Sequence, residues 1–326
     1  MSCFLSSITG FGRSFPIAGI GGFRRQKTPR GVRMIEHNCY CIRIQNLPVF
    51  FPERLHNLLC RCLRWVWRPW RRRDEAFGRS KRTALLMTND PRVPLLLLPG
   101  TACDERVFAP LIEGLCGYPF LIGDMSGART MPGLAESVLE AAPPFFHLAG
   151  FSLGGICALE MVAQQPERIA TLVLIDTTAR PDPPANAAVR YQAVEQARNL
   201  GMESYIQNAW SRLVAPINLE TAMLRETIVA MARDCGVERL HAQTEVAINR
   251  RDSRPRLASI TQATLVLAGA CEQVCPLEAQ QEIADGIPDA VLHLIEDAGH
   301  FAPLENSKAV ARHVGRWLTA HSGPQS

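Results

Sequence analysis

Short apolar runs alternate with segments of helical periodicity from about residue 93 onward. The apolar runs have the length of buried strands and lie at residues 95–98, 120–122, 145–149, 171–175, 264–268 and 290–295. Helical patterns lie near residues 107–115, 134–142, 156–165, 276–287 and 307–318. Strands that alternate with helices are typical of βαβ units, whose continuous apolar strands are buried on both faces. The pattern therefore predicts an α/β fold with a mostly parallel sheet of six to eight strands flanked by helices.

One long segment departs from this alternation. Residues 178–262 have helical periodicity and no convincing strand, yet strand-like runs lie on both sides of them. We expect this segment to be an inserted helical lid. It contains His241, which faces either the substrate or the surface. It also carries apolar side chains that either line a pocket or pack the lid onto the core: Met202, Tyr205, Trp210, Met223 and Met231.

The most informative motif is Gly150–Gly155, which reads Gly-Phe-Ser-Leu-Gly-Gly. It follows the apolar run at 145–149 and precedes an apolar helical run. Strand, Gly-x-Ser-x-Gly and helix is the context in which this motif forms a nucleophile elbow. The serine then sits on a strained turn, and glycines on both sides avoid a collision across it. The motif alone is weak evidence, but its flanks make Ser152 the predicted nucleophile.

A serine hydroxyl is a poor nucleophile at neutral pH and needs a base, which in turn needs an acid to orient it. Candidates for both follow Ser152 in the order acid, then histidine. Glu272 lies three residues after Gly269, past the run at 264–268. His300 lies on the loop between the run at 290–295 and the last helical segment. Asp176, directly after the run at 171–175, is an alternative acid.

These motifs resemble the α/β-hydrolase superfamily over residues 93–320. Leu98-Pro99-Gly100-Thr101 stands where members usually have an apolar residue followed by His-Gly. Asp124–Gly127 stands where they often have Asp-x-x-Gly-His-Gly, and Gly299–Glu305 is similar to their histidine loop.

The resemblance implies Ser152 as nucleophile, His300 as general base and then acid, and Glu272 as the orienting carboxylate. It also implies an oxyanion hole formed by the backbone N–H groups of Leu153 and Thr101. Members usually have Asp where this chain has Glu272, and the extra methylene moves the carboxylate by more than about 1 Å. Asp176 therefore remains an alternative acid.

The resemblance implies a serine hydrolase that cleaves a small carboxylic ester through an acyl-serine intermediate, as small carboxylesterases do. An enol-lactonase of the 3-oxoadipate type and a C–C bond hydrolase of the same fold are alternatives. A catalytically silent binding protein is the alternative from another class. The expected partner is a small ester or lactone. No two histidines have metal-ligand spacing and no Gly-rich phosphate loop occurs, so we expect neither a metal nor a cofactor.

The charge distribution divides the chain into two parts. Residues 1–86 carry 17 Lys and Arg against four Asp and Glu, whereas the remainder carries 18 against 27. We expect residues 1–86 to be a basic, Arg-rich extension that is disordered or not part of the working protein, and residues 87–326 to form the hydrolase domain. A transit peptide, or a segment that binds a membrane surface or nucleic acid, is the alternative for the extension. We expect no nucleic-acid partner for the domain.

The eleven cysteines are scattered and odd in number, which does not indicate a disulfide framework in a chain of 326 residues. A reducing cytoplasm is therefore the expected location. No apolar stretch approaches 20 residues, so the sequence predicts no transmembrane helix. The oligomeric state stays open.

Overall fold

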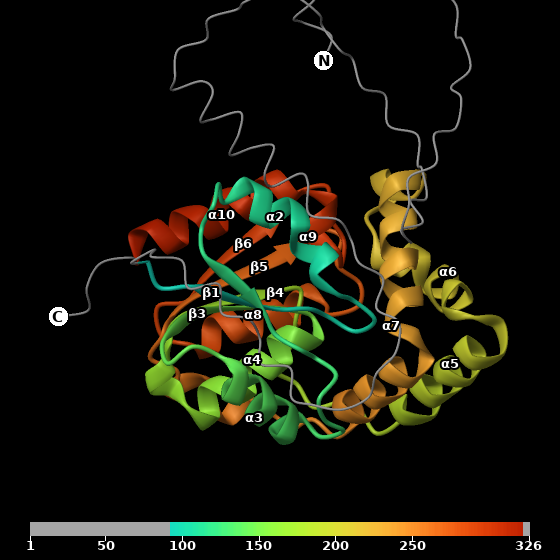
Figure 1. Ribbon diagram of the computed structural model, residues 1–326, viewed down its shortest axis with the longest axis horizontal. Coiled ribbons are helices and arrows are strands. Elements are labelled where there is room, and N and C mark those ends of the chain that lie inside the picture. The colour runs from blue at the N-terminus through green and yellow to red at the C-terminus, as the bar shows by residue number, and fades with distance from the viewer. Residues whose placement is uncertain (1–91, 322–326) are drawn as a thin grey trace, which may run out of the picture. The chain divides into compact units, whose positions relative to one another are not determined.

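A six-stranded, all-parallel sheet lies at the centre of the computed structural model, which describes residues 92–321 (Figure 1). The basic extension predicted at residues 1–86 lies outside the described residues. The strand order is β2-β1-β3-β4-β5-β6, and every neighbouring pair is parallel. The strands are β1 (Leu95–Leu98), β2 (Phe120–Ile122), β3 (Phe146–Phe151), β4 (Ile169–Ile175), β5 (Ala263–Gly269) and β6 (Val291–Ile295).

The central strands are apolar without interruption because helices cover both faces of the sheet. Every residue of β1, β3 and β4 is buried. The side chains of successive residues point to opposite faces, so β1 contributes Leu95 and Leu97 to one core cluster and Leu96 and Leu98 to the other. The predicted α/β class, with its parallel sheet, is confirmed.

The helices form one layer on each side of the sheet (Figure 1). One layer contains α2 (Ala109–Gly114), α9 (Ala302–Glu305) and α10 (Ser307–Ala320). The other contains α3 (Met131–Ala141), α4 (Leu153–Gln164) and α8 (Leu277–Gly286). Four short 3-10 helices also occur in the described residues: η1 (Glu105–Phe108), η2 (Pro166–Arg168), η3 (Pro216–Asn218) and η4 (Arg254–Ser259).

The helix predicted at 107–115 is divided in the structure. The Asp104 carboxylate accepts from Arg106 N and begins the 3-10 helix η1, and the α-helix α2 starts only at Ala109. Pro110 stands in the first turn of α2, where its missing N–H costs no intrahelical bond. The periodic pattern therefore located the segment but not the change of helix type.

The segment between β4 and β5 contains three α-helices and no strand, as its periodicity predicts. They are α5 (Asn186–Leu200), α6 (Met202–Leu213) and α7 (Ala222–Ile248). Gly201, with φ of 86°, separates α5 from α6, and Gly236, with φ of 74°, interrupts α7. A positive φ is readily available to glycine alone. These two glycines therefore bend the insertion, which lies to one side of the sheet (Figure 1).

Candidate active site

The residues predicted for the site all follow the carboxyl ends of parallel strands. Thr101 comes after β1, Ser152 directly after β3, Asp176 after β4, Glu272 after β5 and His300 after β6. In a parallel sheet these ends meet along one edge, where α/β proteins bind their ligands. The topology thus brings residues together that lie up to about 200 positions apart.

Ser152 lies on a strained turn between β3 and α4. Its φ of 54° and ψ of −117° fall in a region that non-glycine residues rarely occupy. The neighbouring glycines are required by contact: a Cβ on Gly150 would lie 2.4 Å from Gly154 O, and a Cβ on Gly154 would lie 2.0 Å from Leu98 O. The turn therefore projects the Ser152 side chain from the end of β3, as the motif predicts.

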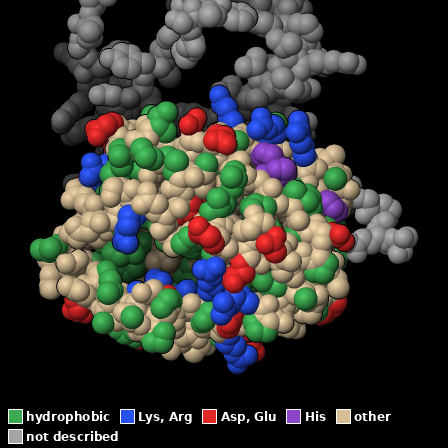
Figure 2. Space-filling view, turned by 180° about the vertical axis from the view of Figure 1, so that it is seen from behind, with side chains coloured by type: hydrophobic (Ala, Val, Ile, Leu, Met, Phe, Trp, Pro, Cys, Tyr) green, Lys and Arg blue, Asp and Glu red, His purple; other side chains and the backbone are tan. Residues whose placement is uncertain are grey.

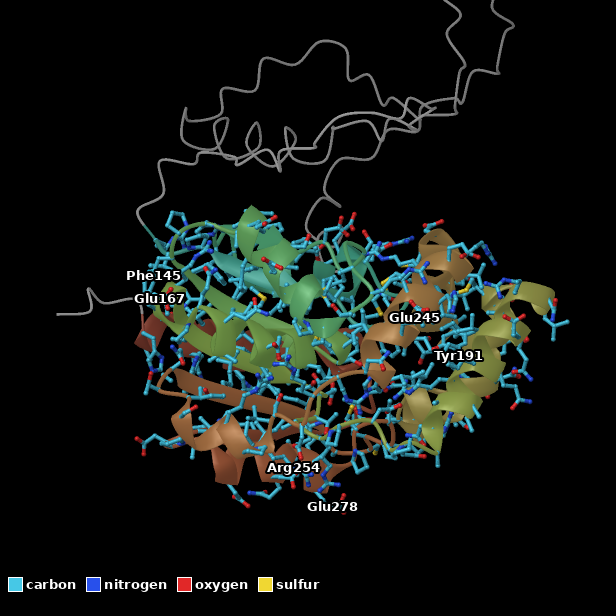
Figure 3. The ribbon with its side chains drawn as sticks, turned by 90° about the horizontal axis from the view of Figure 1, so that it is seen from below. Phe145, Glu167, Tyr191, Glu245, Arg254 and Glu278 are labelled. Atoms are coloured by element: carbon cyan, nitrogen blue, oxygen red, sulfur yellow. The ribbon has the colours of Figure 1, made fainter. Side chains whose placement is uncertain are left out.

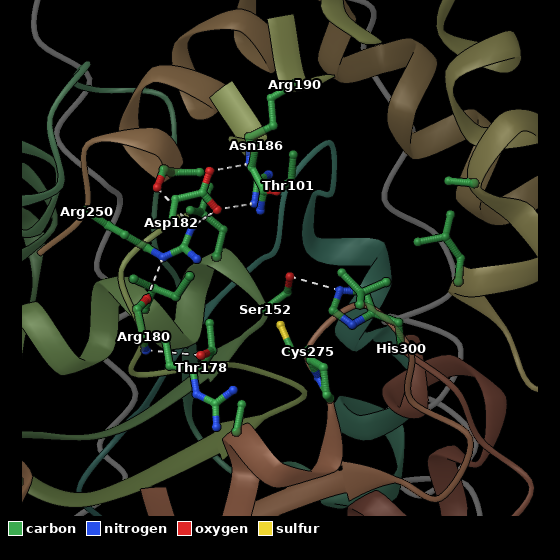
Figure 4. Close-up of a pocket in the computed structure, with 18 of the residues that line it drawn as sticks. Thr101, Ser152, Thr178, Arg180, Asp182, Asn186, Arg190, Arg250, Cys275 and His300 are labelled. Carbon is green, nitrogen blue, oxygen red and sulfur yellow. Dashed lines mark hydrogen bonds and ion pairs between the residues drawn. The ribbon is translucent and has the colours of Figure 1, made fainter. Parts of the chain in front are cut away.

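Ser152, His300 and Glu272 form a continuous hydrogen-bonded chain. His300 Nε2 lies 2.9 Å from Ser152 Oγ (Figure 4), and His300 Nδ1 lies 2.5 Å from Glu272 Oε2. A carboxylate oxygen only accepts, so the Nδ1 proton is donated to Glu272 and the Nε2 lone pair faces the serine hydroxyl. This arrangement allows the imidazole to take a proton from Ser152.

Glu272 is held by its own loop, which explains how the longer side chain fits. Its Oε1 accepts from Val274 N at 2.5 Å and from Cys275 N at 3.1 Å, which leaves Oε2 for His300. The Glu272 side chain has no exposed surface. The extra methylene is therefore accommodated by a turn that fixes the carboxylate.

Asp176, the alternative acid, is fully buried but does not contact the histidine. Its Oδ1 accepts from Gly269 N at 2.7 Å, and its Oδ2 has no hydrogen-bond partner in the described part of the chain. Burial, together with the nearby charge of Glu272, raises the pKa of Asp176 well above its ordinary value. The structure thus brings Glu272, and not Asp176, into contact with His300.

The loop that carries His300 is fixed by Glu305, for which the sequence suggested no role. Glu305 Oε1 accepts from Gly299 N and Phe301 N, and Oε2 accepts from Ala215 N and Asn218 Nδ2. His300 N also donates to the carbonyl of Leu213 at the end of α6, at 3.0 Å. One carboxylate therefore ties the histidine loop to the insertion.

The two amides predicted for the oxyanion hole flank the nucleophile. Thr101 and Leu153 both line the cavity that contains Ser152, and neither amide is hydrogen-bonded to another protein group within residues 92–321. Gly100 lets the loop after β1 approach the nucleophile, since a Cβ on Gly100 would lie 3.1 Å from Ser152 Cβ. Gln243 of α7 holds the loop by accepting from Ala102 N at 2.9 Å. Sequence inspection gave no sign of this contact, because 141 residues separate its partners.

A cavity of about 410 Å³ opens above Ser152. Figure 2 shows a hollow in one face of the molecule with basic and acidic side chains gathered beside it. The insertion supplies much of the cavity wall, including Tyr205 and Ile206 of α6 and Arg190 of α5. This volume suits a small organic molecule. Of the apolar residues proposed for the wall, Tyr205 lines the cavity, whereas Met231 is buried in the core and Met223 is exposed.

His241 does not line the cavity. Its ring packs against Tyr191 at 6.1 Å between centroids, and its Nε2 lies 3.7 Å from Glu245 Oε1. Figure 3 shows Tyr191 on α5 and Glu245 on α7; Tyr191 is exposed, and the side chain of His241 is 28% exposed. Of the two roles open to His241, the structure gives it the surface role.

Within residues 92–321 there is no group of three or more His, Cys, Asp and Glu side chains arranged to hold a metal ion. The helices in this range are all too short or too polar to cross a membrane.

Comparison with known proteins assigns the chain to a family. Residues 143–307, half of the chain, match the model of the alpha/beta hydrolase fold family. The chain belongs to the α/β-hydrolase fold family.

Three similar proteins are hydrolases by name. A protein of Variovorax paradoxus named carbamate hydrolase RutD is 28% identical over 71% of this chain and 93% of its own length. A pimeloyl-[acyl-carrier protein] methyl ester esterase of Aromatoleum aromaticum is 26% identical over 64% of this chain and 86% of its own. The structure of a thermophilic esterase from Thermogutta terrifontis has a TM-score of 0.66 at 26% identity, over 71% of this chain and 91% of that one.

Proposed function

We propose that this protein is a serine hydrolase that cleaves small carboxylic esters through an acyl-enzyme on Ser152. The observation that carries the proposal is the chain of contacts from Ser152 Oγ through His300 to Glu272, at 2.9 and 2.5 Å. The named relatives support it, because they include esterases.

In the first half-reaction, Ser152 Oγ attacks the ester carbonyl carbon while His300 Nε2 takes the hydroxyl proton. The tetrahedral oxyanion is held by the N–H groups of Thr101 and Leu153, and each such donor contributes about 3 kcal/mol to transition-state stabilisation. The bond from carbon to the alcohol oxygen then breaks, and His300 gives its proton to the departing alcohol.

In the second half-reaction, water takes the place of the alcohol. His300 removes a proton from the water as its oxygen attacks the acyl carbon, and the bond to Ser152 Oγ breaks. The proton returns from His300 to Ser152, and the carboxylic acid leaves. Glu272 stays ionised throughout and stabilises the imidazolium that forms twice in each cycle.

A fluorophosphonate probe tests the nucleophile. The wild type should be labelled and should hydrolyse p-nitrophenyl acetate, whereas Ser152→Ala should do neither. Ser126→Ala is a matched control, because Ser126 lies on an exposed turn where it bonds Asp124, and this variant should label normally. A folded wild type that the probe does not label would show the proposal to be wrong. A panel of esters, lactones and carbamates would then rank the substrate classes.

A further inference from the structure

The wall of the cavity carries an excess of positive charge. Its charged lining residues are Arg180, Arg190 and Arg250, with Asp182 as the one acid among the described residues that line it. Arg180 is neutralised outside the cavity, since its Nε donates to Glu282 Oε2 at 2.7 Å. Two guanidinium groups therefore face one carboxylate within the cavity.

Arg190, Arg250 and Asp182 form a cluster with fixed geometry, here called the arginine pair around Asp182, in which Arg250 and Asp182 are buried and Arg190 is partly exposed. Arg190 binds Asp182 through two parallel hydrogen bonds of 2.8 Å, from Nε to Oδ2 and from Nη2 to Oδ1. Arg250 Nη1 lies 3.0 Å from Asp182 Oδ1, and the side chains of Arg250 and Asp182 are 6% and 1% exposed. Although burial opposes ionisation, the hydrogen bond and charge of Arg190 hold the pKa of Asp182 below its ordinary value.

Each arginine keeps one nitrogen without a protein acceptor. Arg190 uses Nε and Nη2 for Asp182, which leaves Nη1. Arg250 uses Nε for the carbonyl of Arg180 and Nη1 for the carbonyl of Ala247 and for Asp182, which leaves Nη2. No acceptor for these two nitrogens occurs in residues 92–321. Both arginines line the cavity, so their free nitrogens are available to an acceptor that enters it, and two positively charged donors favour an anion.

The position of the cluster indicates which part of an ester would reach it. Figure 4 shows Ser152 between His300 on one side and Arg250 with Asp182 on the other. His300 Nε2 gives its proton to the alcohol, so the alcohol leaves on the histidine side. The acyl group stays on Ser152, and the opposite side of the cavity is open to its distal end.

We propose that the arginine pair around Asp182 binds a carboxylate at the far end of the acyl group, so that the substrates are monoesters of dicarboxylic acids. This inference rests on the proposed ester hydrolysis at Ser152. Two forked guanidinium groups suit the planar carboxylate, which accepts two parallel hydrogen bonds. Asp182 holds both guanidinium groups in place before the substrate enters, which reduces the entropy lost on binding.

Matched substrates test the inference. Monomethyl esters of straight-chain diacids carry the carboxylate, and the methyl ester monoamides of the same diacids have the same shape without the charge. At the chain length that spans the cavity, kcat/KM for the acid should exceed that for the amide by about tenfold to a hundredfold, the effect of a charge-assisted hydrogen bond.

Two variants and one control variant test whether the preference for the acid depends on the arginine pair around Asp182. Arg190→Gln should reduce the preference for the acid to about twofold or less, because it lowers kcat/KM for the acid more than kcat/KM for the neutral amide. Arg198→Gln is the matched control on the same helix, because Arg198 pairs with Glu195 and Glu238 outside the cavity, and it should keep the preference. Arg250→Gln should act like Arg190→Gln, with circular dichroism to establish that this buried variant folds.

Binding without catalysis provides an independent measurement. Titration calorimetry of Ser152→Ala compares three ligands: glutarate, adipate and inorganic phosphate. A dicarboxylate should bind, and adding Arg190→Gln to Ser152→Ala should weaken its binding at least tenfold. Phosphate that binds more tightly than either dicarboxylate would overturn the carboxylate assignment. If the wild type is labelled at Ser152 but shows no preference at any chain length, the inference is wrong and the proposed function stands. If the probe does not label and dicarboxylates still bind through Arg190, the proposed function and the ester substrates are wrong, and the carboxylate site alone stands.

Discussion

Replacing Glu272 by Gln removes the negative charge beside His300 and keeps the size of the side chain. The Nδ1–Oε2 contact of 2.5 Å joins two buried side chains, 6% and 0% exposed, so solvent is a poor substitute for the lost acceptor. The amide can present an N–H group to Nδ1, and the ring proton then moves to Nε2, where it blocks transfer from Ser152. We expect kcat to fall by about 10³ to 10⁴, which corresponds to about 4–5.5 kcal/mol of transition-state stabilisation.

Glu272→Asp keeps the negative charge and moves the carboxylate, so it tests the position of the charge and not its presence. Shortening the side chain by one methylene withdraws the carboxylate by about 1.5 Å, which opens the 2.5 Å contact to about 4 Å if the loop does not move. That distance is outside hydrogen-bonding range. We expect a loss of about 10² in kcat, as for other small misplacements of catalytic groups.

Burst and steady-state kinetics with p-nitrophenyl acetate measure both variants, with circular dichroism to establish folding. Asp176→Asn is the comparison, because its side chain makes no contact with His300, and it should lose less than about tenfold. A greater loss for Asp176→Asn than for Glu272→Gln would refute the assignment of Glu272 as the orienting acid.

Three further outcomes are expected. Burial and the charge of Glu272 raise the pKa of Asp176 above 3.8, so the folded state holds this proton more tightly than the unfolded chain, and the stability it contributes is lost as pH rises through the folded pKa. Asp176→Asn should therefore lose less stability than the wild type as pH rises above about 4 in urea denaturation, and parallel profiles would contradict this. Gly154→Ala places a Cβ 2.0 Å from a backbone oxygen of β1 and should destabilise by about 3 kcal/mol, whereas Gly315→Ala, with 3.4 Å to its nearest neighbour, should be neutral or stabilising in thermal unfolding. Glu305→Gln removes an acceptor from buried N–H groups and should lower the free energy of unfolding by about 1–3 kcal/mol. It should also lower kcat more than it raises KM, and a variant that loses stability alone would contradict the positioning role of Glu305.

Much of the fold could be predicted because its signals are local. A buried strand needs only a few consecutive apolar residues, and each of the six predicted runs overlaps a strand of the structure. The elbow was recognisable because Gly150 and Gly154 are required by contacts within a single turn and the adjoining strand β1. His300 was recognisable because a short loop motif surrounds it.

The remaining site features depend on contacts across long separations. Whether Glu272 or Asp176 reaches His300 depends on loop geometry, which periodicity does not describe. Arg250 meets Asp182 across 68 positions, and Glu305 accepts from Ala215 N across 90 positions as well as from its own loop. An isolated Arg or Asp in the sequence gives no sign of such partners. Those pairings arise only when the insertion folds back over the sheet.

The insertion between β4 and β5 carries the arginine pair around Asp182 in a different stretch of sequence from the nucleophile, the base and the acid. Asp182, Arg190 and Arg250 all belong to one contiguous segment of the chain, whereas Ser152, Glu272 and His300 all lie outside it. A gene segment that encodes another helical insertion could be grafted between these strands if it kept the contacts of Leu213, Ala215 and Asn218 with the histidine loop and of Gln243 with the loop after β1. Recombination at the ends of β4 and β5 would then change which acyl groups are accepted while the bond-breaking apparatus keeps its support.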